Sequence, residues 1–334
     1  MEDAITNGPR ARRPRRRAGP LALTLLSLAI HAVGCTSPYS RLLPERSAGA
    51  AEATRRGEYL VRTVSVCGHC HAEDVSDPDG PLSGGHAFES WRFGTYRAAN
   101  LTPDSATGLG TWSVGEIVRA IRTGVDDEGR VLLPVMPYES LRGLSDADAL
   151  AITLYLKSLK PVRHETPDDP DLALSLLGEL LVRPAPPVTG PVEAPPRGAT
   201  AEYGRYLANS VALCADCHTP RGGLREGFDR SKLFAGDPTP VADFPVPPSN
   251  LTPDSATGIG RWSEEEFLRT MREGVDPEGD SVNDFMPWRE YRRMTDADLQ
   301  AIYRYLRTLP PIRNEIPDTL GAPPRADGPR GGGA

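Results

Sequence analysis

The feature that most constrains this chain is a five-residue motif that occurs twice. Two cysteines separated by two residues are followed at once by histidine, at Cys67-Gly68-His69-Cys70-His71 and at Cys214-Ala215-Asp216-Cys217-His218. Cysteines at this spacing attach the two vinyl groups of one haem as thioethers, and the adjacent histidine then reaches the iron. A bare cysteine pair also occurs in redox dithiols and in half of a zinc site, but here both copies end in histidine. The motifs therefore predict two covalently bound haem c groups.

Length and composition are consistent with two small domains. The chain has 334 residues, and a typical domain takes about 100 to 150 residues. Only 39% of the residues are hydrophobic, while 34 prolines and 33 glycines indicate extensive loops. A haem supplies apolar core of its own, so two haem-bearing units with little regular structure fit this composition.

The N-terminus has the pattern of an export signal. Six arginines lie from Arg10 to Arg17, an apolar run follows from Leu21 to Ile30, and small residues precede Cys35. The run is too short for a comfortable membrane span. We predict a signal peptide over residues 1–34, general secretion and a periplasmic protein. Its removal changes the formal net charge from −7 to −11, because six arginines and two acidic residues are lost. We expect no nucleic-acid partner for so acidic a chain.

Cys35 is the fifth cysteine and belongs to neither motif. A free thiol in an oxidising compartment is a liability unless it is consumed, and lipid on the first mature residue would consume it. We therefore expect a bacterial lipoprotein that is attached to the membrane through lipid on Cys35. The alternative is ordinary signal cleavage, because Ala32 and Gly34 satisfy its small-residue rule and the usual leucine at position 32 is missing.

The two halves of the chain are copies of one unit. Residues Asn100–Gly108 recur unchanged 150 positions later at Asn250–Gly258, and the haem motifs are 147 positions apart. Four segments are predicted after the signal: a cytochrome-sized domain at 50–168, a linker rich in proline and leucine at 169–196, a second domain at 197–318 and a disordered tail at 319–334.

The linker contains six leucines within residues 172–181. A disordered linker would not hold so many leucines, so we expect this short segment to pack at the domain junction. The alternative is a docking surface for a partner or a membrane.

Each unit is predicted to be mostly α-helical, because helix signals occur in both copies and strand-like alternation is nearly absent. A capping box begins one helix at Ser113 and at Ser263, each with glutamate three residues later. Glycine is expected to end these two helices, at Gly124 and Gly274.

Two further helices are expected in each unit. One begins at Ser145 or Thr295 and should end at proline, Pro161 or Pro310. The other precedes the haem motif and contains a glycine, Gly57 or Gly204, that allows another helix to approach closely. We expect that neighbour to be the helix that carries Tyr155 or Tyr305.

A haem iron with one histidine either takes a sixth ligand or stays open for chemistry. Among the five methionines, only Met136 and Met286 correspond at the offset of 150, and each is followed by proline. A thioether on a proline-stiffened loop is a soft ligand that favours reduced iron, so we predict these two as iron ligands. The alternative is that they fill the core.

The remaining methionines and histidines have other predicted roles. Met271 and Met294 align with Ile121 and Leu144, which marks them as packing residues. His69 lies inside its own motif and cannot reach the same iron. His86 and His164 have no histidine at the corresponding position of the other repeat, so we expect them to lie at the surface or in loops.

Trp112 and Trp262 immediately precede the capping serines. An indole N–H needs a partner when it is buried, and a haem propionate would serve, so both tryptophans are candidates for haem contact. The duplicated Asn-Leu-Thr-Pro-Asp loop has donors for propionates too, but we interpret it as a tight structural turn.

With these motifs, the chain resembles the class I cytochromes c, and more closely the multihaem cytochrome c subunits of membrane-associated alcohol, aldehyde and gluconate dehydrogenases. The resemblance covers both units and rests on Phe93-Gly94-Thr95-Tyr96, the Asn-Leu-Thr-Pro-Asp loops, the Trp-Ser helix starts, the Met-Pro-Tyr and Met-Pro-Trp loops, and Cys217-His218-Thr219-Pro220-Arg221. Many of those subunits carry three haems and a C-terminal membrane-binding stretch, whereas this chain has two motifs and a hydrophilic tail.

The resemblance implies that His71 and Met136 bind one iron and that His218 and Met286 bind the other. It also implies that the protein passes electrons from a periplasmic dehydrogenase to a respiratory-chain acceptor. We therefore predict two tandem class I cytochrome c-like haem domains that carry electrons and perform no substrate chemistry.

Two other functions are considered. A dihaem enzyme, either a peroxidase or a sulfur-compound dehydrogenase, needs a labile or unusual iron ligand, and the only spare cysteine is Cys35 at the processed end. A scaffold or sensor would use haem as structural core and would not be reduced rapidly by any donor.

Overall fold

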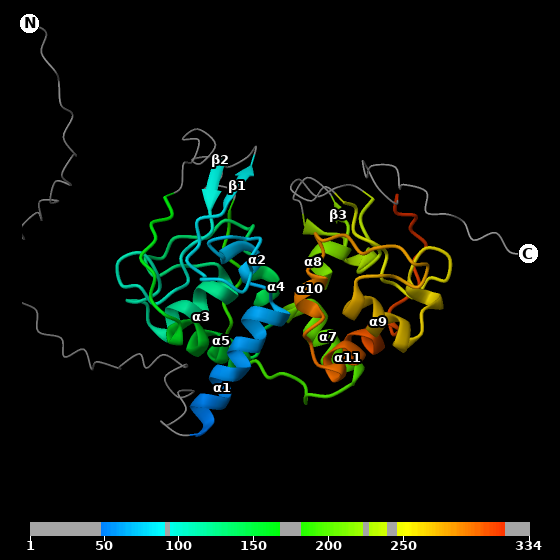
Figure 1. The fold of residues 1–334 in the computed structure, drawn as a ribbon, viewed down its shortest axis with the longest axis horizontal. Helices are drawn as coiled ribbons and strands as arrows, with labels where there is room; N and C mark the ends of the chain where they lie inside the picture. Colours follow the sequence, from blue (N-terminus) through cyan, green and yellow to red (C-terminus); the bar gives the residue numbers. More distant parts are fainter. Residues whose placement is uncertain (1–47, 91–93, 168–181, 223–226, 239–245, 318–334) are drawn as a thin grey trace, which may run out of the picture. The chain divides into compact units, whose positions relative to one another are not determined.

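The computed structural model describes residues 48–90, 94–167, 182–222, 227–238 and 246–317 (Figure 1). The predicted signal peptide, Cys35, the leucine-rich segment and the tail at 319–334 lie outside the described residues. The described residues, all from 48 onward, fall within one compact unit. Both repeats therefore belong to the same unit, and the domain boundaries predicted from the sequence stay a prediction.

The first repeat is largely helical. In chain order its elements are α1 (Ala48–Tyr59), the π-helix η2 (Leu60–Val64), α2 (Gly68–His71), β1 (Ala87–Ser90), β2 (Gly94–Arg97), α3 (Val114–Thr123), α4 (Tyr138–Leu141) and α5 (Asp146–Ser158).

The second repeat has the same order of helices. Its elements are α7 (Ala201–Tyr206), the π-helix η3 (Leu207–Val211), α8 (Cys214–His218), β3 (Arg221–Gly222), β4 (Gly227–Phe228), the 3₁₀ turns η4 (Arg230–Lys232) and η5 (Ile259–Arg261), α9 (Glu264–Glu273), α10 (Trp288–Tyr291) and α11 (Asp296–Leu306).

Both predicted capping boxes are confirmed. Ser113 and Ser263 accept a hydrogen bond from the backbone N–H of the glutamate three residues later, and that glutamate accepts one from the serine N–H. Both helices end at glycine with left-handed backbone, φ 68° at Gly124 and 70° at Gly274. Local sequence rules therefore place α3 and α9.

Two expectations need correction. Short antiparallel hairpins follow each haem motif, β1 with β2 and β3 with β4, although almost no strand signal is present. The helices α5 and α11 end at Ser158 and Leu306, before the prolines expected to stop them. At these ends Ser158 and Thr308 donate to the carbonyls of Tyr155 and Tyr305, which are acceptors that a longer helix would use.

The two repeats share one hydrophobic cluster and exchange reciprocal hydrogen bonds. Tyr59 Oη donates to Asp298 at 2.6 Å, and the Thr295 N–H donates to the same hydroxyl. The corresponding Tyr206 donates to Asp148 at 2.8 Å and accepts from the Ser145 N–H. Each repeat therefore places a tyrosine at the start of the other repeat's long helix.

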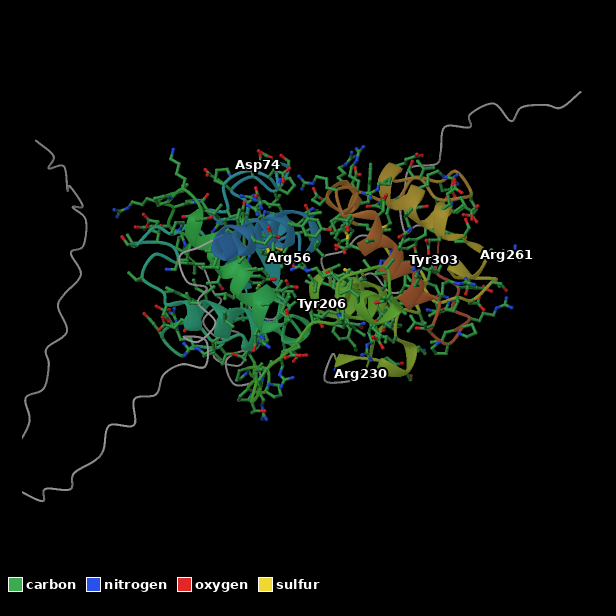
Figure 2. The ribbon with its side chains drawn as sticks, turned by 90° about the horizontal axis from the view of Figure 1, so that it is seen from below. Arg56, Asp74, Tyr206, Arg230, Arg261 and Tyr303 are labelled. Carbon is green, nitrogen blue, oxygen red and sulfur yellow. The ribbon has the colours of Figure 1, made fainter. Side chains whose placement is uncertain are left out.

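A buried ion pair lies at this contact. The guanidinium of Arg56 binds both carboxylate oxygens of Asp148 at 2.9 Å, and the two side chains are only 7% and 4% exposed. Figure 2 labels Arg56 and Tyr206, which come from different repeats and share Asp148 as a partner. Burial alone would raise the pKa of Asp148, but the bonds from Arg56 and Tyr206 hold it below its ordinary value.

The close helix approach predicted at Gly57 and Gly204 is confirmed. A Cβ atom at Gly57 would lie 1.9 Å from the Ala151 carbonyl oxygen of α5, and one at Gly204 would lie 1.8 Å from that of Ala301 in α11.

We predict that Gly57→Ala lowers the free energy of unfolding by about 1 to 3 kcal/mol, because the helices must separate. Urea denaturation measures this, and Gly190→Ala, with open space within 4 Å, is the matched control. Equal stability of the two variants would contradict the prediction.

Candidate functional site

Each haem motif contains a short helix, and a strained residue lies immediately before each motif. Val66, before Cys67, has φ 43°, and Leu213, before Cys214, has φ 57°. Apolar side chains with a Cβ atom rarely adopt this left-handed conformation, which costs of order 1 kcal/mol or more. The same strain at corresponding positions indicates that the turn from the π-helix into the motif is required in both repeats.

The four motif cysteines are half-buried, and none of them forms a disulfide with another described cysteine. Burial raises the pKa of Cys67 and Cys214 to about 12, with smaller contributions from the neighbouring Cys70 and Cys217, respectively. Burial likewise raises the pKa of Cys70 and Cys217 to about 11. Redox dithiols instead use a cysteine that ionises readily. Neutral sulfur in an apolar setting suits a thioether bond to haem.

Both motif histidines are oriented by a backbone carbonyl. His71 Nδ1 lies 2.8 Å from the Ala99 oxygen, and His218 Nδ1 lies 2.7 Å from the Ser249 oxygen. Because a carbonyl oxygen can only accept, Nδ1 carries the proton and Nε2 keeps its lone pair for a metal. Burial lowers the pKa of both imidazoles against the opposing effect of the carbonyl, which favours the neutral, ligating form.

The duplicated loop holds these carbonyls in place. Asn100 follows Ala99, accepts from the Thr102 N–H at 2.9 Å and donates to the Val162 carbonyl at 2.8 Å. Asn250 repeats both bonds with Thr252 and Ile312 at the same distances. The structural interpretation of the loop is confirmed. The loop also fixes the acceptor of the histidine, which sequence reasoning missed.

The candidate methionine ligands occupy equivalent positions ahead of α4 and α10. Met136 and Met286 are half-buried and pack against the hydrophobic cluster that Cys67 and Cys214 also contact. Their carbonyls accept from the N–H of Tyr138 and Trp288, the first residues of the two short helices. Trp112 and Trp262 are half-buried against the same cluster.

The other methionines and histidines have different surroundings. Met271 and Met294 are 6% and 2% exposed, as packing residues should be. His86 places its ring edge-on to Phe88, 4.7 Å between centroids.

The repeats also contact each other through the haem motifs. His69, between the cysteines of the first motif, lies with Nε2 2.8 Å from the carboxylate of Glu290 in α10. Asp216, at the same place in the second motif, accepts from the hydroxyl of Ser140 in α4 at 2.5 Å. Each motif therefore contacts the short helix that follows the candidate methionine of the other repeat.

Among the described residues, no helix is both long enough and apolar enough to cross a lipid bilayer.

The residues present fit a haem in chemistry and in arrangement. Two thiols that burial keeps neutral and one carbonyl-oriented imidazole share a short helix, and a thioether packs against the same apolar cluster. Together with the small, mostly helical fold, these features define a protein of the c-type cytochrome class.

Comparison with known proteins agrees with this class. The sequence profile of the cytochrome c family matches residues 201–310. A dihaem cytochrome c-type protein of Cereibacter sphaeroides is 31% identical over 278 residues, which cover 80% of this chain and 90% of that protein. The chain belongs to the cytochrome c family.

Two further relatives are subunits of dehydrogenases. The gluconate 2-dehydrogenase cytochrome c subunit of Pantoea cypripedii is 32% identical, over 76% of this chain and 59% of that subunit. The cytochrome c subunit of the quinone alcohol dehydrogenase of Gluconobacter oxydans is 29% identical, over 77% of this chain and 55% of that subunit. The chain therefore spans a little over half the length of these two relatives.

Proposed function

We propose that the chain is a dihaem c-type cytochrome that carries electrons from a dehydrogenase to a respiratory-chain acceptor. Each repeat forms one tandem haem domain, at residues 50–168 and 197–318. The observation that carries the proposal is the geometry shared by His71 and His218, whose Nδ1 atoms both donate to a backbone carbonyl and leave Nε2 for an iron.

The residues of each repeat have complementary roles. Cys67 and Cys70, or Cys214 and Cys217, would hold the haem covalently, and the adjacent histidine would be one ligand of its iron. Met136 or Met286 would be the second ligand from the chain, and Trp112 or Trp262 would donate to a propionate. When bound, the haem supplies an iron that takes up and releases one electron. Two protein ligands on each iron leave no position for a substrate, so the chain itself is not an enzyme.

A ligand-binding measurement tests this proposal against the dihaem enzyme. The reduced protein should bind no carbon monoxide at neutral pH, because both axial positions of each iron are filled by the chain. Stoichiometric binding at one haem would favour the peroxidase or sulfur-compound dehydrogenase function for that repeat.

The names of the relatives support a dehydrogenase as electron donor. Relatives are named as cytochrome subunits of gluconate, alcohol and fructose dehydrogenases. Rapid reduction by such a dehydrogenase in stopped-flow mixing would support this partner. Reduction that is slow with every candidate donor would favour the scaffold or sensor function.

We also propose export and lipid attachment. Residues 1–34 act as the signal, and lipid on Cys35 anchors an acidic body that would not bind an anionic membrane surface by charge. A lipidated N-terminal cysteine carries a diacyl group and a further amide-linked acyl chain. These three chains are more than the two membrane-binding signals that stable anchoring requires. We predict that Cys35→Ser releases the protein into the soluble periplasmic fraction with both haems attached. Wild-type protein that is already soluble after lysis would contradict lipidation and support ordinary cleavage.

A further inference from the structure

The two haem motifs have similar surroundings, with one difference in charge. Arg62 and Asn209 correspond at the motif offset of 147. Each donates to the tyrosine of its long helix, Arg62 Nε to Tyr155 Oη at 3.0 Å and Asn209 Nδ2 to Tyr305 Oη at 3.0 Å. The contact is the same in both repeats, but only the first repeat builds it with a permanent positive charge.

Arg62 is held firmly beside the first motif. Its Nη1 donates to the carbonyls of Pro78 at 3.0 Å and Gly80 at 2.8 Å, and its guanidinium lies 5.9 Å from the centre of the Tyr155 ring. The residue is half-buried, so water screens its charge less than that of an exposed arginine. The Pro78 carbonyl that accepts from Arg62 lies against Gly68 of the motif, where an added Cβ atom would be 2.0 Å from it, so the guanidinium lies beside the motif helix.

Other charges near the motifs do not remove this difference. Each motif has one carboxylate at its contact with the other repeat, Glu290 beside His69 and Asp216 beside Ser140. Both motifs therefore have a carboxylate nearby, so the presence of a carboxylate does not by itself distinguish them. Arg221 is a cation close to the second motif, but it is exposed whereas Arg62 is half-buried, so solvent screens the charge of Arg221 more strongly.

We propose that Arg62 sets the haem of the first repeat at a higher reduction potential than the haem of the second. A fixed cation disfavours the extra positive charge of ferric iron, so it stabilises the reduced state. Electrons then enter at the second repeat and leave from the first. This inference rests on the proposed function, because it requires one His- and Met-ligated haem in each repeat.

The test is a spectroelectrochemical titration of the intact two-haem protein. Wild type should show two midpoints. Arg62→Asn, which copies the second repeat, should lower the higher midpoint and leave the lower one in place, whereas Arg62→Lys keeps the charge and should stay near wild type. If the guanidinium had a purely structural role, both Arg62→Asn and Arg62→Lys would lose it, and both would shift the higher midpoint. Arg55→Asn is the matched control and should move neither midpoint, because Arg55 lies on α1, is 66% exposed and is paired with Glu52.

The outcomes separate this inference from the function on which it rests. A shift of the higher midpoint in Arg62→Asn alone supports it. Two haems with unchanged midpoints in Arg62→Asn, or a shift of the lower midpoint, would overturn it while leaving the electron-carrier function intact. A wild type with one haem, or with spectra that lack His and Met ligation, would overturn the proposed function itself. If Arg62→Asn does not fold, Asn209→Arg provides the reciprocal test, because it should raise the lower midpoint.

Discussion

Replacing Asp148 with alanine should lower the free energy of unfolding by about 3 to 5 kcal/mol, because it leaves the charge of Arg56 buried without its partner. The same carboxylate also accepts from Tyr206 of the second repeat. Loss of Asp148 should therefore weaken the contact between the repeats as well as the first repeat alone. Urea unfolding followed by both circular dichroism and haem absorbance measures this effect.

The pH dependence of the effect has a defined sign. The pKa of Asp148 is lowered in the folded protein by Arg56 and Tyr206, with Arg197 also contributing, although burial alone would raise it. Its stabilisation is therefore present above the unfolded pKa of about 4 and is lost as pH falls through the folded value. Asp148→Asn should be clearly less stable than wild type at pH 7, and the gap should narrow on acidification. A difference in free energy of unfolding that stays constant with pH would contradict this account. So would an equal loss of stability in the exposed control Asp127→Ala.

Met136→Ala and Met286→Ala should each remove about half of the charge-transfer absorbance between thioether and ferric iron near the red end of the visible spectrum. Each repeat contributes its own methionine, so each substitution should change one haem and leave the other intact. The absorbance of the oxidised protein between the visible and near infrared measures the effect.

Met294→Leu provides the control for these variants. Met294 is 2% exposed in the core, so its replacement by a residue of similar volume should leave the band unchanged. Loss of the whole band from one substitution would mean that the methionines are not divided between the repeats. An unchanged band in both alanine variants would mean that neither is a ligand.

Local sequence rules predicted the helices well because their causes are local. Ser113 with Glu116, and Gly124 in the left-handed region, depend only on residues within the helix and its ends. Gly57 was predicted to allow close helix packing from its repetition at Gly204, and the structure confirms that no side chain fits there.

The turn into the haem motif was not predictable from residue preferences. Val66 and Leu213 adopt positive φ although their side chains disfavour it, and five-residue π-helices precede them. Such backbone is imposed by the surrounding fold, since nothing in the local sequence favours it. The hairpins β1–β2 and β3–β4 were missed because they are two to four residues long and show no sustained alternation.

The contacts of the haem motifs with the other repeat escaped prediction for a different reason. Comparing the repeats keeps the residues that occur twice, and His69 with Glu290 differs in type from Asp216 with Ser140. These positions correspond in the two repeats but hold different residue types, so aligning the repeats does not reveal the contacts. Arg62 and Asn209 also differ in type at equivalent positions, although their bonds to Tyr155 and Tyr305 lie within one repeat.

The central claim is that both motifs carry haem, and the first motif is its critical case because the family profile matches only residues 201–310. The most direct measurement is mass spectrometry of proteolytic peptides from the purified protein. The account predicts that the peptide containing Cys67 and Cys70 and the peptide containing Cys214 and Cys217 each carry the mass of one haem. Free thiols or a disulfide in the peptide of the first motif would contradict it.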